Sequence, residues 1–271
     1  MTVVITGASS GIGEKLALKY SSTASKLYLI ARREEALFLL ASKLQKEGLE
    51  VFCRAVDVTD FDALRDVCVS ICEKEERVDI VIANAGVSSE HKAELYEFWD
   101  FKKIIDTNLL GVAAIFDIFA KKMIQQGGGK LVAVSSLASF VAFPTTAAYS
   151  ASKRALNSFL DSMRLLLAPH NIKVINIQPG FIKTPLTDKN GFKMPFLMEL
   201  DYAAERIIQA INKNKKEYAF PFLFSLAAKN ISRLPTFLRD IIIKVALVKM
   251  DSSASTEASF SDTASSVAKA D

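Results

Sequence analysis

The sequence predicts an α/β fold, a doubly wound parallel sheet of about seven strands with helices on both faces and a helical C-terminal extension. Short runs of β-branched and aliphatic residues alternate with stretches of helical periodicity from the first residue onward. The strand candidates are mostly continuous apolar runs, which is typical of parallel strands covered on both faces. With 271 residues, half of them hydrophobic, the chain can build a large core.

The expected elements follow one another in a regular order. Strands are predicted at 2–6, 26–31, 50–56, 78–83, 130–135, 173–178 and 217–221. Helices are predicted at 33–47, 61–76, 98–126, 149–168 and 202–214, and a glycine-containing turn after the first strand opens a further helix. Since strands and helices alternate, right-handed crossovers place the helices on both faces of the sheet.

Domain organisation is predicted from the absence of repeats and of Pro/Gly linkers. We expect one domain at 1–221, an apolar and basic helical extension of the same domain at 222–250, and a Ser/Ala-rich tail at 251–271. The tail has no hydrophobic period, which predicts disorder.

Composition excludes several functional classes. The chain has 34 basic and 30 acidic residues, a balance too even to predict nucleic-acid binding. Two histidines and three cysteines without CxxC or HExxH spacing predict no metal site. The thiols form no disulfide framework and the first residues resemble no secretory signal, so a cytoplasmic protein is expected.

The segment TGASSGIG (6–13) follows the first strand and allows two interpretations. Glycines there permit positive φ angles and close approach of a ligand, and N–H groups at a helix N-terminus favour a pyrophosphate. The same letters spell G-x-S-x-G around Ser9, the nucleophile elbow of serine hydrolases. An elbow needs a histidine, and only His91 and His170 follow, and it needs an oxyanion loop from an earlier strand. The nucleotide interpretation is therefore favoured.

Nucleotide preference is predicted from the end of the second strand, which reads Ala31-Arg32-Arg33. An acidic residue there would bind a ribose 2′-hydroxyl, whereas guanidinium groups bind a 2′-phosphate. Cations at a helix start also oppose the macrodipole, which favours a functional role. NADP(H) is therefore expected over NAD(H).

Acid–base chemistry is predicted at Tyr149 and Lys153, whose four-residue spacing places them on one helix face. A neighbouring ammonium group favours a phenolate, so we expect the pKa of Tyr149 to lie below its usual value of about 10. Ser136 is predicted at the carboxyl end of a strand, where its hydroxyl can polarise a carbonyl group.

Four segments together resemble the short-chain dehydrogenase/reductase family, which has a Rossmann-like fold. They are TGASSGIG, ANAG (83–86), SSLASFVAFPTTAAYSASK (135–153) and PGFIKTP (179–185), in the family's order over roughly 2–221. The resemblance implies that Tyr149 exchanges the proton, Lys153 assists it and holds the nicotinamide ribose, Ser136 holds the substrate oxygen, and Asn108 maintains a water relay. The cofactor would also contact Gly7, Ser9, Gly11, Ile12, Gly13, Arg32, Asp57, Val58, Asn84, Ala85, Gly86, Pro179, Gly180, Ile182 and Thr184.

The substrate is expected to be a small carbonyl or alcohol compound. A lid is predicted at 186–200, where a Met/Phe run suits a lipophilic ligand. A redox-sensing scaffold that binds NADP without turnover is the alternative function. The resemblance also suggests a homodimer or homotetramer packed through 98–126 and 149–168.

The extension at 222–250 is predicted to contact a membrane surface. From Leu234 to Lys249 large apolar residues recur at helical spacing, interrupted by Arg239 and Lys244. A basic amphipathic helix of this kind can lie in the interface of an anionic bilayer. Covering the substrate pocket or a neighbouring subunit is the alternative role.

Overall fold

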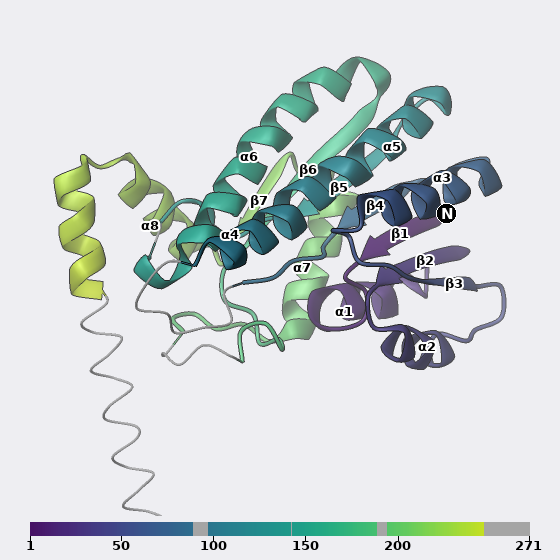
Figure 1. Ribbon diagram of the computed structural model, residues 1–271, viewed down its shortest axis with the longest axis horizontal. Helices are drawn as coiled ribbons and strands as arrows, with labels where there is room; N and C mark the ends of the chain where they lie inside the picture. The colour runs from purple at the N-terminus through teal and green to yellow at the C-terminus, as the bar shows by residue number, and fades with distance from the viewer. Residues whose placement is uncertain (89–96, 142, 189–193, 247–271) are drawn as a thin grey trace, which may run out of the picture.

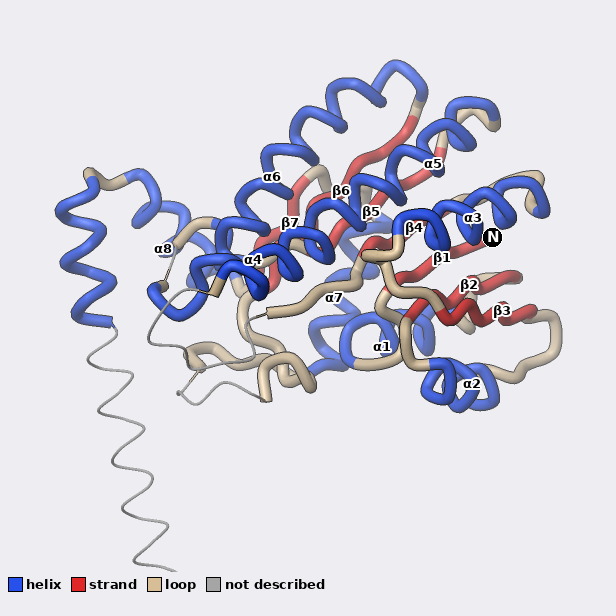
Figure 2. The backbone as a smooth tube through the Cα atoms, viewed as in Figure 1, coloured by secondary structure: helices blue, strands red, loops and turns tan. Residues whose placement is uncertain are grey.

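Seven parallel strands form one sheet in the order β3-β2-β1-β4-β5-β6-β7. The computed structural model describes residues 1–88, 97–141, 143–188 and 194–246 (Figures 1 and 2). The strands are β1 (Thr2–Thr6), β2 (Lys26–Ala31), β3 (Glu50–Ala55), β4 (Ile80–Ala83), β5 (Gly129–Val134), β6 (Ile172–Pro179) and β7 (Glu217–Phe220). The doubly wound parallel sheet predicted from the sequence is confirmed.

Helices cover both faces of this sheet. They are α1 (Gly11–Tyr20), α2 (Glu34–Lys43), α3 (Phe61–Lys74), α4 (Phe98–Ile105), α5 (Gly111–Gln125), α6 (Ala147–Leu167), α7 (Leu200–Asn212) and α8 (Phe222–Arg233). One apolar cluster joins the sheet to α1, α2 and α7. A second joins the other face to α3, α5 and α6. Each large side chain buried in these clusters contributes about 1.5–3 kcal/mol.

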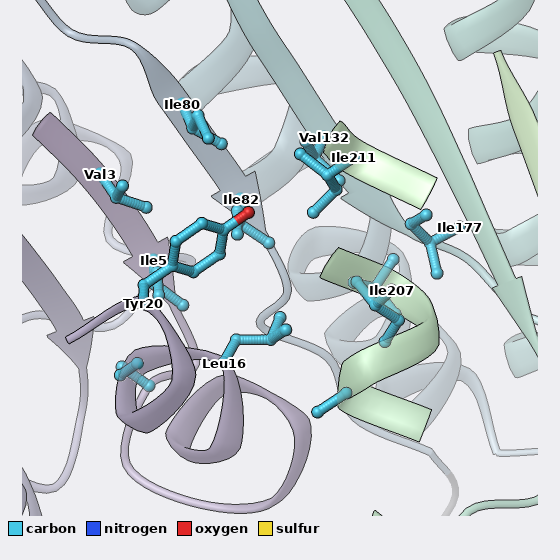
Figure 3. Packing of buried hydrophobic residues seen from close by; sticks show 14 of the residues in the cluster. Val3, Ile5, Leu16, Tyr20, Ile80, Ile82, Val132, Ile177, Ile207 and Ile211 are labelled. Carbon is cyan, nitrogen blue, oxygen red and sulfur yellow. The ribbon is translucent and has the colours of Figure 1, made fainter. Parts of the chain in front are cut away.

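Figure 3 shows how one of these faces is filled. Leu16 and Tyr20 of α1 and Ile207 and Ile211 of α7 lie over aliphatic side chains of the central strands. Ile5 of β1 is fully buried beneath them. Because apolar residues occupy both faces of β1, this strand reads as a continuous apolar run in the sequence.

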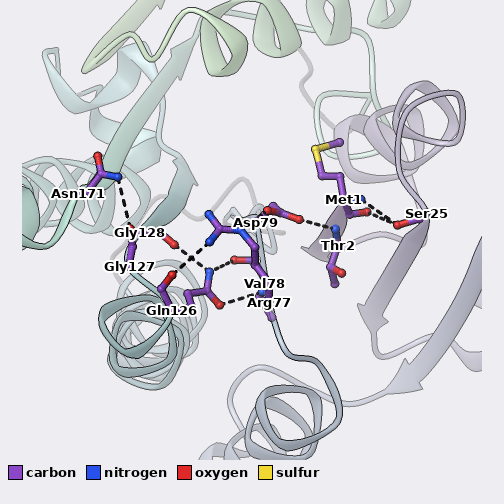
Figure 4. A network of polar contacts seen from close by, with 10 residues as sticks. All are labelled: Met1, Thr2, Ser25, Arg77, Val78, Asp79, Gln126, Gly127, Gly128 and Asn171. Carbon is purple, nitrogen blue, oxygen red and sulfur yellow. Dashed lines mark hydrogen bonds and ion pairs between the residues drawn. The ribbon is translucent and has the colours of Figure 1, made fainter.

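The amino edge of the sheet is held by a network of polar contacts (Figure 4). Gln126 donates to the main-chain oxygen of Val78 over 2.6 Å and accepts from its N–H over 3.0 Å. The N–H of Thr2 donates to the carboxylate of Asp79 over 2.8 Å. These bonds hold the loops that precede β1, β4 and β5, at the edge of the sheet opposite to the carboxyl ends of the strands.

The helix predicted at 98–126 contains a distortion that the sequence did not reveal. α4 continues without a break into a π-helical turn at Asp106–Leu110 and then into α5. The N–H of Gly111 donates to the carbonyl of Asp106, five residues earlier. The π turn therefore introduces one extra residue into the continuous helix formed by α4, this turn and α5.

Most predicted helix boundaries differ from the structure by two residues at most, and the end of α2 differs by more. α2 ends at Lys43, four residues before the predicted end, and Gly48 at φ +79° turns the chain toward β3. In the extension, Pro235 separates α8 from a second helical segment at 236–246. This segment begins two residues after Leu234, where the sequence predicted the start of the amphipathic helix. None of the helices in the described ranges has the length and apolar character to cross a bilayer.

Candidate active site

A cavity of about 350 Å³ opens at the carboxyl ends of the central strands. The strand order reverses around β1, whose neighbours are β2 and β4, and open α/β sheets bind ligands at such a point. All predicted catalytic and cofactor residues line this cavity except Gly13 and Asn108, which lie behind its wall. Residues from the ends of β1 to β6 thus converge although they are separated by up to 177 positions, from Gly7 to Thr184.

The glycine turn forms one wall of the cavity. Gly7 and Gly11 have φ angles of +64° and +57°, which side-chain-bearing residues rarely adopt. A Cβ atom on Gly7 would lie 2.8 Å from the Cα of Ala85, and one on Gly13 would overlap the carbonyl oxygen of Gly7. Asn84 donates to the carbonyl of Thr6 over 3.0 Å, which ties this turn to the end of β4. Glycine is therefore required for the close packing of this wall.

Two arginines stand at the rim beside this turn. The guanidinium of Arg33 donates to the hydroxyl groups of Ser9 and Ser10 over 3.0 and 2.6 Å. Arg32 lies 3.4 Å from the carboxylate of Asp57 and is 59% exposed. Burial acts to raise the pKa of Asp57, but hydrogen bonds from Thr59 and the nearby Arg32 hold that pKa below its usual value. Asp57 is thus an anion that orients Arg32.

The sequence predicted Arg33 only as one of a pair of guanidinium groups for a 2′-phosphate, and it did not single out Ser10. The paired arginines were the available signal, but only the folded chain shows that Arg33 reaches back over the turn. The same contact engages the Ser9 hydroxyl that a hydrolase would need. His170 lies in the turn before β6, at the opposite edge of the sheet, and His91 falls outside the described residues.

Ser136, Tyr149 and Lys153 meet on the side of the cavity formed by β5 and α6. Ser136 follows β5, and its hydroxyl oxygen accepts a 3.1 Å bond from the N–H of Ala138. Tyr149 lies in the first turn of α6 and is hydrogen-bonded to Ser136. Lys153 lies one turn later, with its Nζ 5.7 Å from the centre of the Tyr149 ring. The predicted constellation is thus assembled around one point.

The pKa of Tyr149 differs from the expectation based on the sequence. Burial raises the pKa of this phenol above 10, and the hydrogen bond with Ser136 opposes the shift only in part. Burial also lowers the pKa of Lys153 to about 8. The predicted lowering of the tyrosine pKa is wrong for the protein by itself, because burial of the phenol outweighs the hydrogen bond that favours its ionised form.

Asn108 lies in the π-helical turn, fully buried behind Lys153. Its amide donates to the carbonyl of Val87 over 2.9 Å and to the hydroxyl of Ser152 over 3.1 Å, and its oxygen accepts from the N–H of Val87. A Cβ atom on Gly86 would lie 3.3 Å from this oxygen and 3.7 Å from the Nζ of Lys153. Asn108 therefore fixes the loop after β4 against the helix that bears the lysine.

Asn157, which the sequence did not single out, connects the strands behind the site. Its oxygen accepts bonds from Ser135 over 2.7 Å and from Asn176 over 2.9 Å, and its amide donates to Ser139 over 2.8 Å. Ser139 in turn donates to the carbonyl of Ser136 over 2.6 Å. The end of β5, the middle of β6 and α6 are thus held together at the position of Ser136.

A cluster of aromatic side chains lies next to Gly180, which lines the cavity. The ring of Phe224 in α8 lies 6.1 Å from that of Phe181 and 5.6 Å from that of Phe196. Main-chain bonds pair Met198 with Phe181 and Lys183. Part of the predicted lid, residues 189–193, falls outside the described residues, while Leu186 lines the cavity.

The two ends of the cavity differ in chemistry in a way that suits a dinucleotide. One end carries the glycine turn and two cations, which fit phosphate groups. The other carries a hydroxyl, a phenol and a buried amine within a few ångströms of one another, which fit proton exchange at a carbonyl oxygen.

Comparisons with known proteins agree with this arrangement. Residues 1–194 match the family described as short chain dehydrogenase. An uncharacterized oxidoreductase of Myxococcus xanthus is 36% identical over 239 residues, which cover 88% of this chain and 94% of that protein. A short-chain dehydrogenase from Sphingobium yanoikuyae in complex with NADPH superposes with a TM-score of 0.76, at 24% identity over 87% of this chain and 96% of the other.

An alcohol dehydrogenase from Thermococcus sibiricus, complexed with 5-hydroxy-NADP, has a TM-score of 0.72 at 25% identity. The match covers 81% of this chain and 95% of that one. With the glycine turn, the Ser136, Tyr149 and Lys153 cluster and a family match over most of its length, the chain belongs to the short-chain dehydrogenase/reductase family of NAD(P)-dependent oxidoreductases.

Proposed function

We propose that this enzyme transfers hydride between NADP(H) and a carbonyl or alcohol substrate that is lipophilic. The observation that carries the proposal is the meeting of Ser136, Tyr149 and Lys153 in one cavity with the glycine turn. The nicotinamide of the bound cofactor supplies or accepts the hydride. All other functions in the reaction belong to side chains of this protein.

Tyr149 is the proposed proton donor in reduction and acceptor in oxidation, acting at the substrate oxygen through its hydroxyl. Ser136 donates a second hydrogen bond to the same oxygen, where negative charge develops. Lys153, whose ammonium donates a hydrogen bond of 2.8 Å to the carbonyl of Val134, is the proposed partner of the nicotinamide ribose. Asn108 maintains the proton route from the helix side through its π-helical turn.

The preference for NADP(H) over NAD(H) is proposed from the two rim arginines. Arg32 and Arg33 present cations where β2 ends, the position at which related folds select the ribose substituent. The complexes of the Sphingobium and Thermococcus proteins with NADPH and 5-hydroxy-NADP support this choice. Asp57 and Val58 are proposed to contact the adenine, Asn84 to Gly86 the adenosine ribose, and Pro179, Gly180, Ile182 and Thr184 the nicotinamide.

A lipophilic substrate is proposed from the apolar side chains next to Gly180, a lining residue of the cavity. Phe181, Phe196 and Phe224 cluster there, and Leu186 lines the cavity. Apolar walls with few convergent polar groups are typical of small-molecule sites.

Assembly is proposed to be a homodimer or homotetramer in the cytoplasm, joined through α4, α5 and α6. Trp99, Leu165 and Leu166 on these helices are 64–74% exposed. Large exposed apolar side chains on neighbouring helices are typical of subunit interfaces.

The experiment that tests the proposal compares turnover with cofactor binding. Carbonyl compounds of increasing chain length are screened with NADPH by the loss of nicotinamide absorbance, and Tyr149→Phe is then assayed with the best substrate. We expect Tyr149→Phe to lose turnover and keep its affinity for NADPH. If the unmodified protein binds NADPH but turns over no compound, the redox-sensing scaffold is the better interpretation.

A further inference from the structure

The C-terminal extension, residues 222–246, exposes a series of large apolar side chains. Soluble monomers rarely expose such residues in groups, and where they do the surface usually binds a partner. Figure 1 shows the second helical segment, 236–246, beyond α8 and at the opposite end of the molecule from β3. The exposed residues are Phe222, Leu223, Leu226, Phe237, Leu238, Ile241, Ile242 and Val245.

The segment 236–246 is amphipathic. Phe237, Ile241 and Val245 recur every four residues along one side, with Leu238 and Ile242 beside them. The charged residues Arg239, Asp240 and Lys244 lie on the remaining side of the helix. Although an apolar side of this kind normally packs on a core, Phe237 remains 64% exposed and Ile241 57% exposed.

The charge of the extension indicates which partner would cover it. Residues 222–246 contain four basic residues and one acid, Asp240, a net charge of +3. Lys229 is paired with Glu217 at 3.6 Å. Within the described ranges no ion pair engages Arg233, Arg239 or Lys244. Cations beside exposed apolar residues complement a surface of anionic headgroups over acyl chains.

The extension also contacts the wall of the active site. A Cβ atom on Gly180 would lie 3.2 Å from Pro221 and 3.3 Å from Phe224 at the start of α8. Gly180 lines the cavity, and Phe196, which packs on Phe224, is 59% exposed. A surface bound through the outer side of α8 would therefore lie next to the substrate end of the cavity.

We propose that residues 222–246 dock on a bilayer that contains anionic lipid, with the apolar residues of both helical segments in the interface and Arg233, Arg239 and Lys244 at the phosphate groups. The docking depends on this surface alone and not on the proposed reaction. Neither α8 nor the described part of the second segment, 236–246, would cross the bilayer, because each is far shorter than the roughly 20 residues that a span requires.

The test is flotation of the full chain with vesicles of phosphatidylcholine alone or mixed with phosphatidylglycerol, at low and high salt. We expect the protein to float with the anionic vesicles and to be partly released by salt, because screening weakens the charged contacts. Binding of Phe237→Glu should fall at least tenfold, since burial of one large apolar side chain accounts for that factor. Lys244→Gln should bind about fivefold more weakly.

Two variants with comparable substitutions outside the extension serve as controls. Leu39→Glu changes an exposed leucine on α2, and Lys46→Gln removes an exposed lysine in the following loop. Both should float as the unmodified protein does. Thermal melting confirms that each variant is folded.

Two results would overturn the proposal. The first is a full-length protein that stays unbound with anionic vesicles at low salt. The second is a Phe237→Glu variant that binds vesicles normally and turns an oligomer into a monomer in sedimentation, which would assign the surface to a second copy of the chain.

Discussion

The ammonium group of Lys153 donates a 2.8 Å hydrogen bond to the main-chain oxygen of Val134, the last residue of β5. Within the described residues this is the one hydrogen bond of the ammonium group, and Lys153 is only 4% exposed. Because a buried ammonium group with a single acceptor is poorly solvated, burial lowers the pKa of Lys153 to about 8. The free energy of unfolding consequently depends on the protonation of this residue.

Lys153→Met should stabilise the protein at neutral pH while it abolishes turnover. The unfolded chain binds the lysine proton up to about pH 10.5 and the folded chain only up to about pH 8. Burial of the charged lysine therefore lowers the free energy of unfolding by its full amount below pH 8. This effect diminishes as the pH rises through this window. We expect a gain of up to about 3 kcal/mol at pH 7, reduced by the loss of the Val134 hydrogen bond.

Urea unfolding at several pH values between 7 and 10 measures this gain. The difference between Lys153→Met and the unmodified protein should shrink steadily across the series. Lys213→Met, which removes an exposed lysine after α7, provides the control. A difference that is constant with pH contradicts the assigned pKa.

In the protein without cofactor, Tyr149 should ionise only above pH 10. Burial disfavours the phenolate, and this effect exceeds that of the hydrogen bond with Ser136. The measurement is the tyrosinate absorbance of the unmodified protein minus that of Tyr149→Phe during an alkaline titration. Tyr202→Phe, which changes an exposed tyrosine, checks the subtraction. An ionisation of Tyr149 below pH 10 would show that a nearby cation outweighs burial.

Arg32→Ala should weaken NADPH binding by roughly ten- to a hundredfold and leave NADH binding nearly unchanged. A charge-assisted hydrogen bond to a phosphate contributes about 1.5–3 kcal/mol, and NADH lacks the 2′-phosphate. Titration of nicotinamide fluorescence gives both Kd values. Arg164→Ala on α6, whose partner is Asp161, is the control. Equal affinity of the unmodified protein for the two cofactors would refute the preference.

Asn157→Leu should reduce kcat by at least tenfold with little change in the Kd for NADPH. The residue does not itself line the cavity, but it holds Ser135, Ser139 and Asn176 in one network. Loss of this network also leaves buried polar groups without partners, at a cost of about 1–3 kcal/mol.

Comparison with other substitutions separates positioning from stability. Asn157→Asp keeps the acceptor oxygen and should recover part of kcat, whereas the exposed neighbour Ser158→Ala should behave as the unmodified enzyme. If Asn157→Leu lowers stability and leaves kcat intact at a temperature where it is folded, Asn157 has only a structural role.

Local sequence signals predicted the fold and most of the residues that line the cavity, because each signal depends on a short stretch of chain. The apolar runs of β1 and β2 begin and end where the sequence indicated. Gly7 and Gly11 have the positive φ angles that their turn requires. The spacing of Tyr149 and Lys153 places both on one side of α6.

Features that depend on packing between distant segments were not predicted. Asn157 acquires its partners from β5, β6 and the turn after Ser136, and its own neighbourhood in the sequence is an ordinary helix. The direction of Arg33 depends on Ser9 and Ser10, 24 and 23 residues earlier. The pKa of Tyr149 depends on how deeply the folded chain buries it.

Because of the π-helical turn at Asp106–Leu110, the side-chain directions within the continuous helix from α4 to α5 depend on its number of residues. A π-helical turn contains one residue more than an α-helical turn, so deletion of Leu110 would regularise the turn and change the directions of the side chains within it. Asn108 would no longer face Val87 and Ser152. A substitution keeps the number of residues between α4 and α5, whereas a deletion changes it. The direction of the Asn108 side chain therefore depends on this number as well as on the identity of the residues.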